Sequence, residues 1–161
     1  MKAALRFILL AALAGALIGV TRTLTYPIIA DNEESAQAAI IASMLPGKPD
    51  PQAADRLCSS EVRGYAGTIR LLVLPEAEDP ARSSLEKSIA AVRVVRHTET
   101  PGIGDFIELD KSKWILNFNT LALYADVDTT VNEMQNRIDA VTGATITRRA
   151  IINGVATACL I

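Results

Sequence analysis

GYAGTIRLLVLPE, residues 64–76, is the stretch that decides the fold of the main domain. It opens with two glycines and continues as a run of β-branched and leucine residues, which is typical of a β-strand. A second run, AAVRVVRH (90–97), alternates apolar and polar side chains in the manner of a half-buried strand. The charged stretch between them, EAEDPARSSLEKS (76–88), predicts an excursion away from the sheet.

The chain after residue 97 continues with shorter apolar runs. KWILNF (113–118) and TLALYADV (120–127) are most simply two further strands, and DTTVNEMQNRIDAV (128–141) has a mixed pattern. The last element, residues 146–161, carries apolar side chains at helical spacing: Ile146, Ala150, Ile151, Val155 and Ala158. This part of the sequence therefore predicts a sheet closed by a C-terminal helix.

The chain before residue 64 predicts helix and connection. DNEESAQAAIIASMLPG (31–47) is expected to be a helix capped by Asp31 or Asn32 and ended by Leu45-Pro46-Gly47, and the polar residues 48–63 a loop or a weakly helical connection. The predicted fold class is α+β, a mostly antiparallel sheet with flanking helices, preceded by one N-terminal transmembrane helix.

The transmembrane prediction rests on FILLAALAGALIGV (7–20), which has no polar side chain, and on TRTLTYPIIA (21–30), whose only charge is Arg22. Lys2 and Arg6 precede the run, so the positive-inside rule leaves the amino terminus in the cytoplasm. We expect residues 1–30 to be the cytoplasmic terminus and anchor, and residues 31–161 an extracytoplasmic (periplasmic) domain on the inner membrane. A cleaved signal peptide is the alternative, although no small-x-small site follows the run.

Composition narrows the classes of partner and cofactor. The net charge is −2 and the 16 Lys and Arg are scattered, which disfavours nucleic acid. Cys58 and Cys159 show no metal-binding spacing, so no metal is predicted; in an oxidising compartment they could pair, or both could be ordinary thiols. The single His97 favours a structural role over imidazole catalysis.

The stretch DAVTGAT (139–145) stands directly before the last predicted helix. Small residues and hydroxyls at a helix start leave backbone N–H groups accessible, and with the helix dipole they suit a phosphate. A phosphoryl group there would lie beside the Thr145 hydroxyl. The alternative is an ordinary helix start capped by Thr142.

Three motifs in order along the chain resemble a known family. TGAT followed by ITRRAIINGV resembles the flavinylation motif of the RnfG and NqrC subunits of membrane redox complexes. HTETPGIGD (97–105), with Trp114, Ile115 and Phe118 downstream, resembles the HxETPGLGD segment and tryptophan of RnfG. GYAGTI (64–69) is similar to that family's GYGGxI strand entry. The HxETPGIGD form and the small size favour RnfG over NqrC.

The resemblance implies a covalent cofactor, flavin mononucleotide (FMN), whose phosphate is esterified to the hydroxyl of Thr145. Thr142, Gly143 and Ala144 would surround the phosphate, and Glu99 and Thr100 would be polar groups near the isoalloxazine. It also implies a turn fixed by Pro101, Gly102 and Gly104, and a cavity lined in part by Gly64 and Tyr65. Tyr65 could equally be a core residue, and for Trp114 the core is favoured over stacking on the cofactor.

The implied function is electron transfer within an Rnf-type ion-translocating oxidoreductase complex, without catalysis by this chain alone. The implied partners are the other membrane subunits of that complex and a separate flavin transferase that uses FAD as donor. Three alternatives stay open: an NqrC-like subunit of a sodium-translocating quinone reductase, a membrane-anchored binding module without redox function, and a cleaved, secreted flavoprotein.

Overall fold

The computed structural model describes residues 2–44, 53–77 and 86–159. The described chain divides by its contacts into an N-terminal helical unit, Met1–Ala39, and a folded unit, Ile40–Ile161. Each unit is considered by itself.

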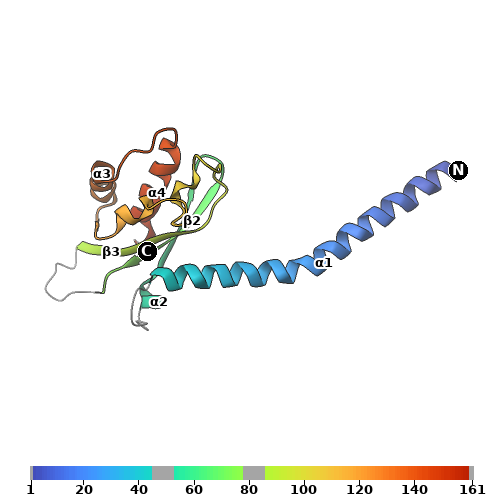
Figure 1. The fold of residues 1–161 in the computed structure, drawn as a ribbon, viewed down its shortest axis with the longest axis horizontal. Helices are drawn as coiled ribbons and strands as arrows, with labels where there is room; N and C mark the ends of the chain where they lie inside the picture. Colours follow the sequence, from blue (N-terminus) through green and yellow to red (C-terminus); the bar gives the residue numbers. More distant parts are fainter. Residues whose placement is uncertain (1, 45–52, 78–85, 160–161) are drawn as a thin grey trace. The chain divides into compact units, whose positions relative to one another are not determined.

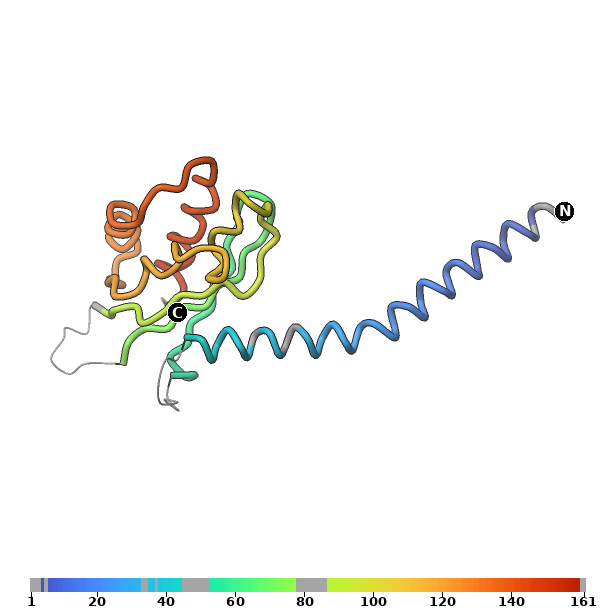
Figure 2. Tube along the Cα trace, in the orientation of Figure 1, coloured from blue at the N-terminus to red at the C-terminus, as the bar shows by residue number. Residues whose placement is uncertain are grey.

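Helix α1 spans Lys2–Met44 without a break and has Pro27 in its interior (Figures 1 and 2). The separate helix predicted from Asp31 is therefore wrong as an element, because its residues up to Met44 continue α1. The predicted stop at Leu45-Pro46-Gly47 lies outside the described residues. Asp31 and Asn32 are not needed as N-caps, because the preceding turn of α1 already supplies carbonyl partners for the backbone N–H groups there.

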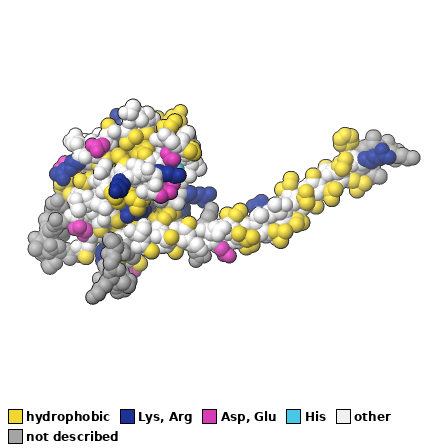
Figure 3. Space-filling view, in the orientation of Figure 1, with side chains coloured by type: hydrophobic (Ala, Val, Ile, Leu, Met, Phe, Trp, Pro, Cys, Tyr) yellow, Lys and Arg dark blue, Asp and Glu magenta, His cyan; other side chains and the backbone are white. Residues whose placement is uncertain are grey.

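Within α1, Arg6–Asn32 is a 27-residue stretch long and apolar enough to cross a membrane. Its large apolar side chains are exposed along the helix (Figure 3). The hydroxyls of Thr21, Thr23 and Thr25 each donate to the carbonyl four residues earlier, at 2.8–2.9 Å. These polar groups are satisfied within the helix itself, which is what an apolar solvent demands.

The folded unit is built on a four-stranded antiparallel sheet in the order β1-β2-β3-β4. The strands are β1 (Cys58–Arg63), β2 (Thr68–Pro75), β3 (Glu86–Arg96) and β4 (Ala122–Tyr124). β1 and β2 are in register from Cys58 opposite Val73 to Arg63 opposite Thr68. The helices are α2 (Ala53–Arg56), α3 (Val127–Arg137) and α4 (Thr145–Ala158), with short 3₁₀ turns η1 (Asp105–Ile107) and η2 (Trp114–Phe118). The predicted α+β class is confirmed.

Two sequence predictions are corrected, and one stretch without a predicted element is assigned. Residues 58–63, predicted as connection, form the edge strand β1. KWILNF, predicted as a strand, forms η2, because Trp114, Ile115 and Phe118 are all buried and only a helical turn brings side chains at that spacing to one face. The mixed stretch 128–141 contains most of α3, which Asp126 caps by accepting from the backbone N–H and hydroxyl of Thr129 at 2.8 and 2.6 Å. Those bonds lower the pKa of Asp126.

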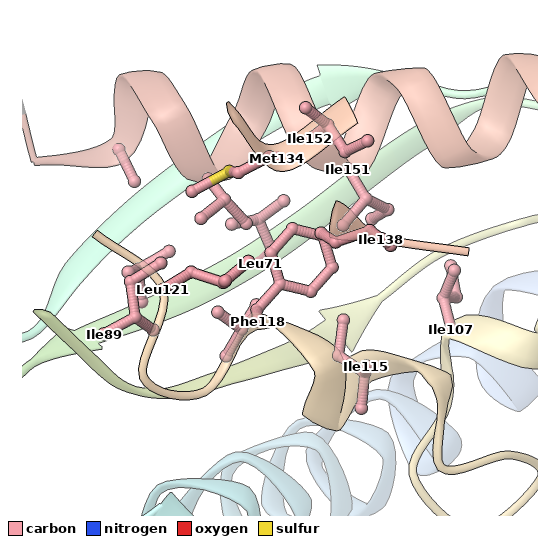
Figure 4. Close-up of a cluster of buried hydrophobic side chains, with 14 of the residues drawn as sticks. Leu71, Ile89, Ile107, Ile115, Phe118, Leu121, Met134, Ile138, Ile151 and Ile152 are labelled. Carbon is pink, nitrogen blue, oxygen red and sulfur yellow. The ribbon is translucent and has the colours of Figure 1, made fainter. Parts of the chain in front are cut away.

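The main core lies between one face of the sheet and helices α3 and α4. The ring of Phe118 lies among aliphatic side chains from every layer: Leu71, Ile89, Ile115, Leu121, Met134, Ile138, Ile151 and Ile152 (Figure 4). α4 approaches the sheet closely at Gly154, where a Cβ would stand 2.7 Å from Leu71 Cδ2 and 2.9 Å from Val62 Cγ1. A smaller cluster of Met44, Ala53, Leu74 and Ala91 forms separately.

The two cysteines are joined as a disulfide, with 5.3 Å between their Cα atoms. Cys58 is the first residue of β1 and Cys159 is the C-cap of α4. The pairing that the sequence left open is thus present, and it fastens the last helix to the edge of the sheet across 101 residues of chain.

Thr120 has a backbone φ of +67°, in the left-handed region that a β-branched residue adopts at a cost. Its side chain is exposed, while its backbone N–H donates to Ile89 O at 2.7 Å. We expect Thr120→Gly to raise the free energy of unfolding by about 1 kcal/mol by removing this strain. Denaturant unfolding measures the change. Thr157→Gly, at an exposed position inside α4, is the control and should have the opposite sign; a loss of stability in both variants would contradict the expectation.

Candidate functional site

A pocket of about 350 Å³ lies where the three sequence motifs meet. That volume is within the range of small-molecule sites, about 300–1,000 Å³. It is lined by Tyr65, Glu99, Thr100, Ile103, Gly104, Gly143, Ala144, Thr145, Ile146 and Thr147. The β1–β2 connection, the loop after β3 and the start of α4 each contribute to it, so residues far apart in sequence form one site.

The structure brings six of the predicted site residues to this pocket: Thr145, Gly143, Ala144, Glu99, Thr100 and Tyr65. Thr142, Gly102 and Gly64 do not line it. Four lining residues were not predicted as ligand contacts: Ile103, Gly104, Ile146 and Thr147. The sequence could have indicated Ile146 and Thr147, since they follow Thr145 in the first turn of the predicted helix and must lie near any group bound at its start.

The start of α4 has its backbone donors open. The N-cap is Ala144, and the structure shows no side-chain hydrogen bond to this cap, so Thr142 does not cap the helix. Gly143 precedes it with φ +82° and open space where a Cβ would be. Thr145 is exposed at the first helical position. Unpaired N–H groups and the helix dipole favour an anion beside the Thr145 hydroxyl, so the residues present fit a phosphate.

The loop after β3 is a tight turn, as its sequence predicts. The backbone N–H groups of Ile103 and Gly104 both donate to Thr100 O, at 3.1 and 2.9 Å. Gly102 has φ +77°, and its N–H donates to Asp105 Oδ1 at 2.8 Å. Gly102 therefore sets the shape of the turn without lining the pocket, and the turn presents Thr100 and Ile103 to it.

Glu99 is buried at the base of the pocket, with 5% of its surface exposed. Its Oε1 accepts from the backbone N–H of Ala66 at 3.0 Å, and its Oε2 accepts from the hydroxyl of Thr147 at 2.6 Å. One carboxylate thus links the β1–β2 connection to the first turn of α4. The sequence pointed to Glu99 as a group near a flavin ring, and the structure shows that both its oxygens are engaged within the protein.

The absence of a side chain at Gly64 leaves room for the carboxylate of Glu99. A Cβ at position 64 would collide with Glu99 Oε1 and stand 2.6 Å from Ile69 Cδ1, a fully buried side chain. We expect Gly64→Ala to lower the free energy of unfolding by about 1–3 kcal/mol, because neither neighbour can move freely. Thermal unfolding checks it, with Gly102→Ala as the control for a strained glycine whose Cβ would meet open space. Equal stability of Gly64→Ala and the parent chain would show that the Glu99 carboxylate can move to make room for the added methyl group.

His97 and Trp114 both make contacts within the folded unit. His97 Nδ1 accepts from the backbone N–H of Glu99 at 3.1 Å, so its Nε2 is free to donate to Glu108 Oε1 at 2.7 Å. Trp114 packs edge-on against Phe106 and Phe118, and its indole N–H donates to Asp139 O at 3.2 Å. The core interpretation of Trp114 is confirmed, and its hydrogen bond fixes the backbone just before TGAT.

A larger hollow of about 710 Å³ lies elsewhere, lined by Ile40, Ser43, residues 93–97 and residues 108–110. Arg93 donates there to Val92 O at 2.7 Å and to Ser43 O at 3.4 Å, and burial lowers its pKa. None of the lining comes from TGAT or GYAG. The smaller pocket is therefore the candidate site, because the motifs and the open helix start converge on it.

Comparison with known proteins agrees with this choice. Residues 81–159 match the model of the FMN-binding domain family. The chain is similar to the G subunit of the ion-translocating oxidoreductase complex of Pectobacterium atrosepticum, with 43% identity over 94 residues, covering 57% of this chain and 41% of the relative. The same subunit of Pasteurella multocida is 44% identical over 94 residues (57% and 43%), and that of Erwinia tasmaniensis 37% over 110 residues (67% and 49%).

The chain spans less than half the length of these curated relatives in the alignments. The matched family region contains the loop after β3 and the TGAT stretch, which between them supply most of the pocket. Residues 81–159 of this chain are therefore similar to the FMN-binding domain family, and most of the pocket lies within the matched region.

Proposed function

We propose that this chain is an electron-transfer flavoprotein subunit of a membrane-bound, ion-translocating oxidoreductase complex, and that it carries FMN covalently on Thr145. One observation carries the proposal: within the region that matches the FMN-binding domain family, an exposed threonine hydroxyl stands at an uncapped helix start that lines a ligand-sized pocket. Similarity to the G subunits of such complexes supports the complex as its setting.

The phosphate end of the site would be held by α4. Thr145 Oγ1 would attack the FMN-side phosphorus of FAD, the pyrophosphate bond would break, AMP would leave, and the hydroxyl proton would pass to a base of the transferase. The product is a phosphoester between Thr145 and FMN. Gly143 and Ala144 offer little side-chain obstruction there, and the first N–H groups of α4 would donate to the phosphate oxygens.

The ring end of the site would be held by apolar side chains. Tyr65, Ile103 and Ile146 are 72%, 56% and 54% exposed, and all three line the pocket. In the described part of the folded unit, the one other exposed large hydrophobic side chain is Leu109, at 38%. Exposed apolar groups that gather at one place mark a binding surface, and here they offer the flavin ring a face to cover.

The bound flavin would supply the redox chemistry, accepting and donating electrons. The residues of this chain have the tasks of binding and orientation: Thr145 fixes the phosphate, and the turn at 99–104 shapes the opposite wall. Electron transfer requires no acid–base pair from the protein.

The setting would be the inner membrane, with α1 as a single-pass anchor and the folded unit on the periplasmic side. Lys2 and Arg6 at the start of the apolar stretch support that orientation. The disulfide supports it independently, because disulfides persist in oxidising compartments and are rare in the cytosol. The partners would be the other membrane subunits of the complex and the flavin transferase.

The test is to produce the full chain with a flavin transferase and FAD and to measure its intact mass. The expected product exceeds the unmodified chain by one FMN less one water, and it stays fluorescent after denaturing electrophoresis. An unmodified mass under conditions in which a G subunit from one of these complexes is modified would leave a non-redox binding module as the better description. Amino-terminal sequencing of the same product distinguishes an anchored chain from a cleaved one.

A further inference from the structure

Thr147 is buried and Thr145 is exposed, although both lie in the first turn of α4. Successive residues of an α-helix are about 100° apart, so side chains two positions apart point about 200° away from each other. Thr145 is exposed, whereas Thr147 is only 1% exposed and donates to Glu99 Oε2 at 2.6 Å. The direction in which the Thr145 hydroxyl points is thus coupled to where Thr147 is held.

The acceptor of that bond is itself held in place. Glu99 Oε1 is bonded to the backbone of Ala66, and the backbone of Glu99 donates to His97 Nδ1. Gly104 packs so closely that a Cβ there would stand 2.8 Å from both Cβ and Oε2 of Glu99. A carboxylate enclosed in this way offers a fixed point for the first turn of α4.

The first turn of α4 has few other ties to the pocket. The described residues provide no side-chain cap at Ala144. Arg148 donates to the carbonyls of Gln135, Ile138 and Asp139, at 2.9, 2.7 and 3.1 Å, which ties α4 to the end of α3 and the residues after it, and not to the loops at 65 and 99–104. Helix ends without caps fray. Among the described residues, the Thr147–Glu99 bond is the side-chain hydrogen bond that holds this turn against the loop at Glu99.

We propose that Glu99 and Thr147 are positioning residues, which orient the first turn of α4 so that the Thr145 hydroxyl faces the flavin being transferred. The inference rests on the proposed function, since it concerns the same attachment atom. Neither side chain takes part in the transfer itself; the pair acts through the geometry of Thr145.

The test compares Thr147→Val with Thr130→Val. Thr130 is a matched control, because it is 0% exposed, lies in the first turn of α3, and its hydroxyl bonds the backbone at Tyr124 N and Asp126 O. Both substitutions exchange a buried hydroxyl for a methyl group, but only Thr147 touches the pocket. The measurement is the initial rate of covalent FMN incorporation into the full chain by the transferase at saturating FAD.

We expect Thr147→Val to slow incorporation by roughly tenfold or more, because a small misplacement of a reacting atom is costly. Thr130→Val should stay within about twofold of the parent chain, since a hydrogen bond lost elsewhere changes overall stability and not this geometry. Thr147→Ser keeps the hydroxyl and should restore the rate. A parent-like rate for Thr147→Val, or equal slowing by both valine variants, would overturn the proposal. If a valine variant does not fold, the alanine pair is compared in the same way.

Amide hydrogen exchange of the flavin-free chain separates this inference from the proposed function. Thr147→Val should raise exchange of the Arg148 amide, which donates to Ala144 O, and of the amides that follow it in α4, relative to Thr130→Val. If the parent chain gains no flavin, the proposed function fails and exchange alone decides on the positioning pair: equal exchange in the two variants refutes it. If the parent chain gains flavin while Thr147→Val does so equally fast, only the positioning role is refuted.

Discussion

Thr145→Ala is expected to leave the chain without covalent flavin while its fold is retained. The side chain is exposed and makes no hydrogen bond with another described residue, so its loss should change the free energy of unfolding by no more than about 0.5 kcal/mol. The attachment atom, however, is gone, and with it the whole product. Denaturing electrophoresis read by flavin fluorescence, together with intact mass, measures the loss.

Two neighbouring variants sharpen that result. Thr145→Ser keeps the hydroxyl and should still accept FMN. Thr142→Ala should also accept it, because Thr142 is exposed, does not line the pocket and does not cap α4. If Thr145→Ala remained fluorescent after denaturation, the ester would lie on another residue and the assignment of Thr145 would have to be withdrawn.

Replacing both cysteines by serine is expected to lower the free energy of unfolding by about 2–5 kcal/mol, since the disulfide closes a long loop and restricts the unfolded chain. The separation of 101 residues is large, and the bond joins the edge strand to the last helix. Denaturant unfolding of the full chain in detergent, followed by tryptophan fluorescence, measures the difference, because Trp114 reports on the core that α4 covers.

A reductant is the internal control for the disulfide. It should destabilise the parent chain by a similar amount and leave Cys58→Ser/Cys159→Ser unchanged. The double variant is preferred to either single one, which would leave an unpaired thiol beside the sheet edge. Identical unfolding curves for the parent chain and the double variant would mean that packing of α4 on the sheet suffices without the covalent bond.

The parts of the fold that the sequence predicted well are those with local, periodic signals. Ile69, Leu71 and Val73 alternate along β2 and are fully buried, and α4 follows from the spacing of its apolar residues. β1 was missed because the side chains of CSSEVR are mostly small or polar, which is not typical of a strand. It forms a strand because its backbone pairs with β2. Its cysteine is also the residue whose partner could not be read from spacing.

The candidate site was predictable to the level of its motifs but not of its internal contacts. TGAT, ETPGIG and Tyr65 were each recognised in sequence, and the structure brings them to one pocket. The bond between Thr147 and Glu99 spans 48 residues and depends on how a helix and a loop are placed by the sheet. No local pattern encodes such a pair, so the sequence predicted Glu99 as a polar group of the site but not its bond to Thr147.

The contact of α4 with β1 and β2 has a consequence for biogenesis. The first strand of the domain and its last helix are neighbours, so β1 leaves the ribosome long before the element that completes its surroundings. Native pairings so distant in sequence form late in folding. Half of the residues that line the pocket, among them the proposed attachment residue Thr145, lie in that last helix or directly before it. If Thr145 carries FMN as proposed, a nascent or C-terminally truncated chain would be no substrate for the flavin transferase, and modification would follow synthesis of the whole chain.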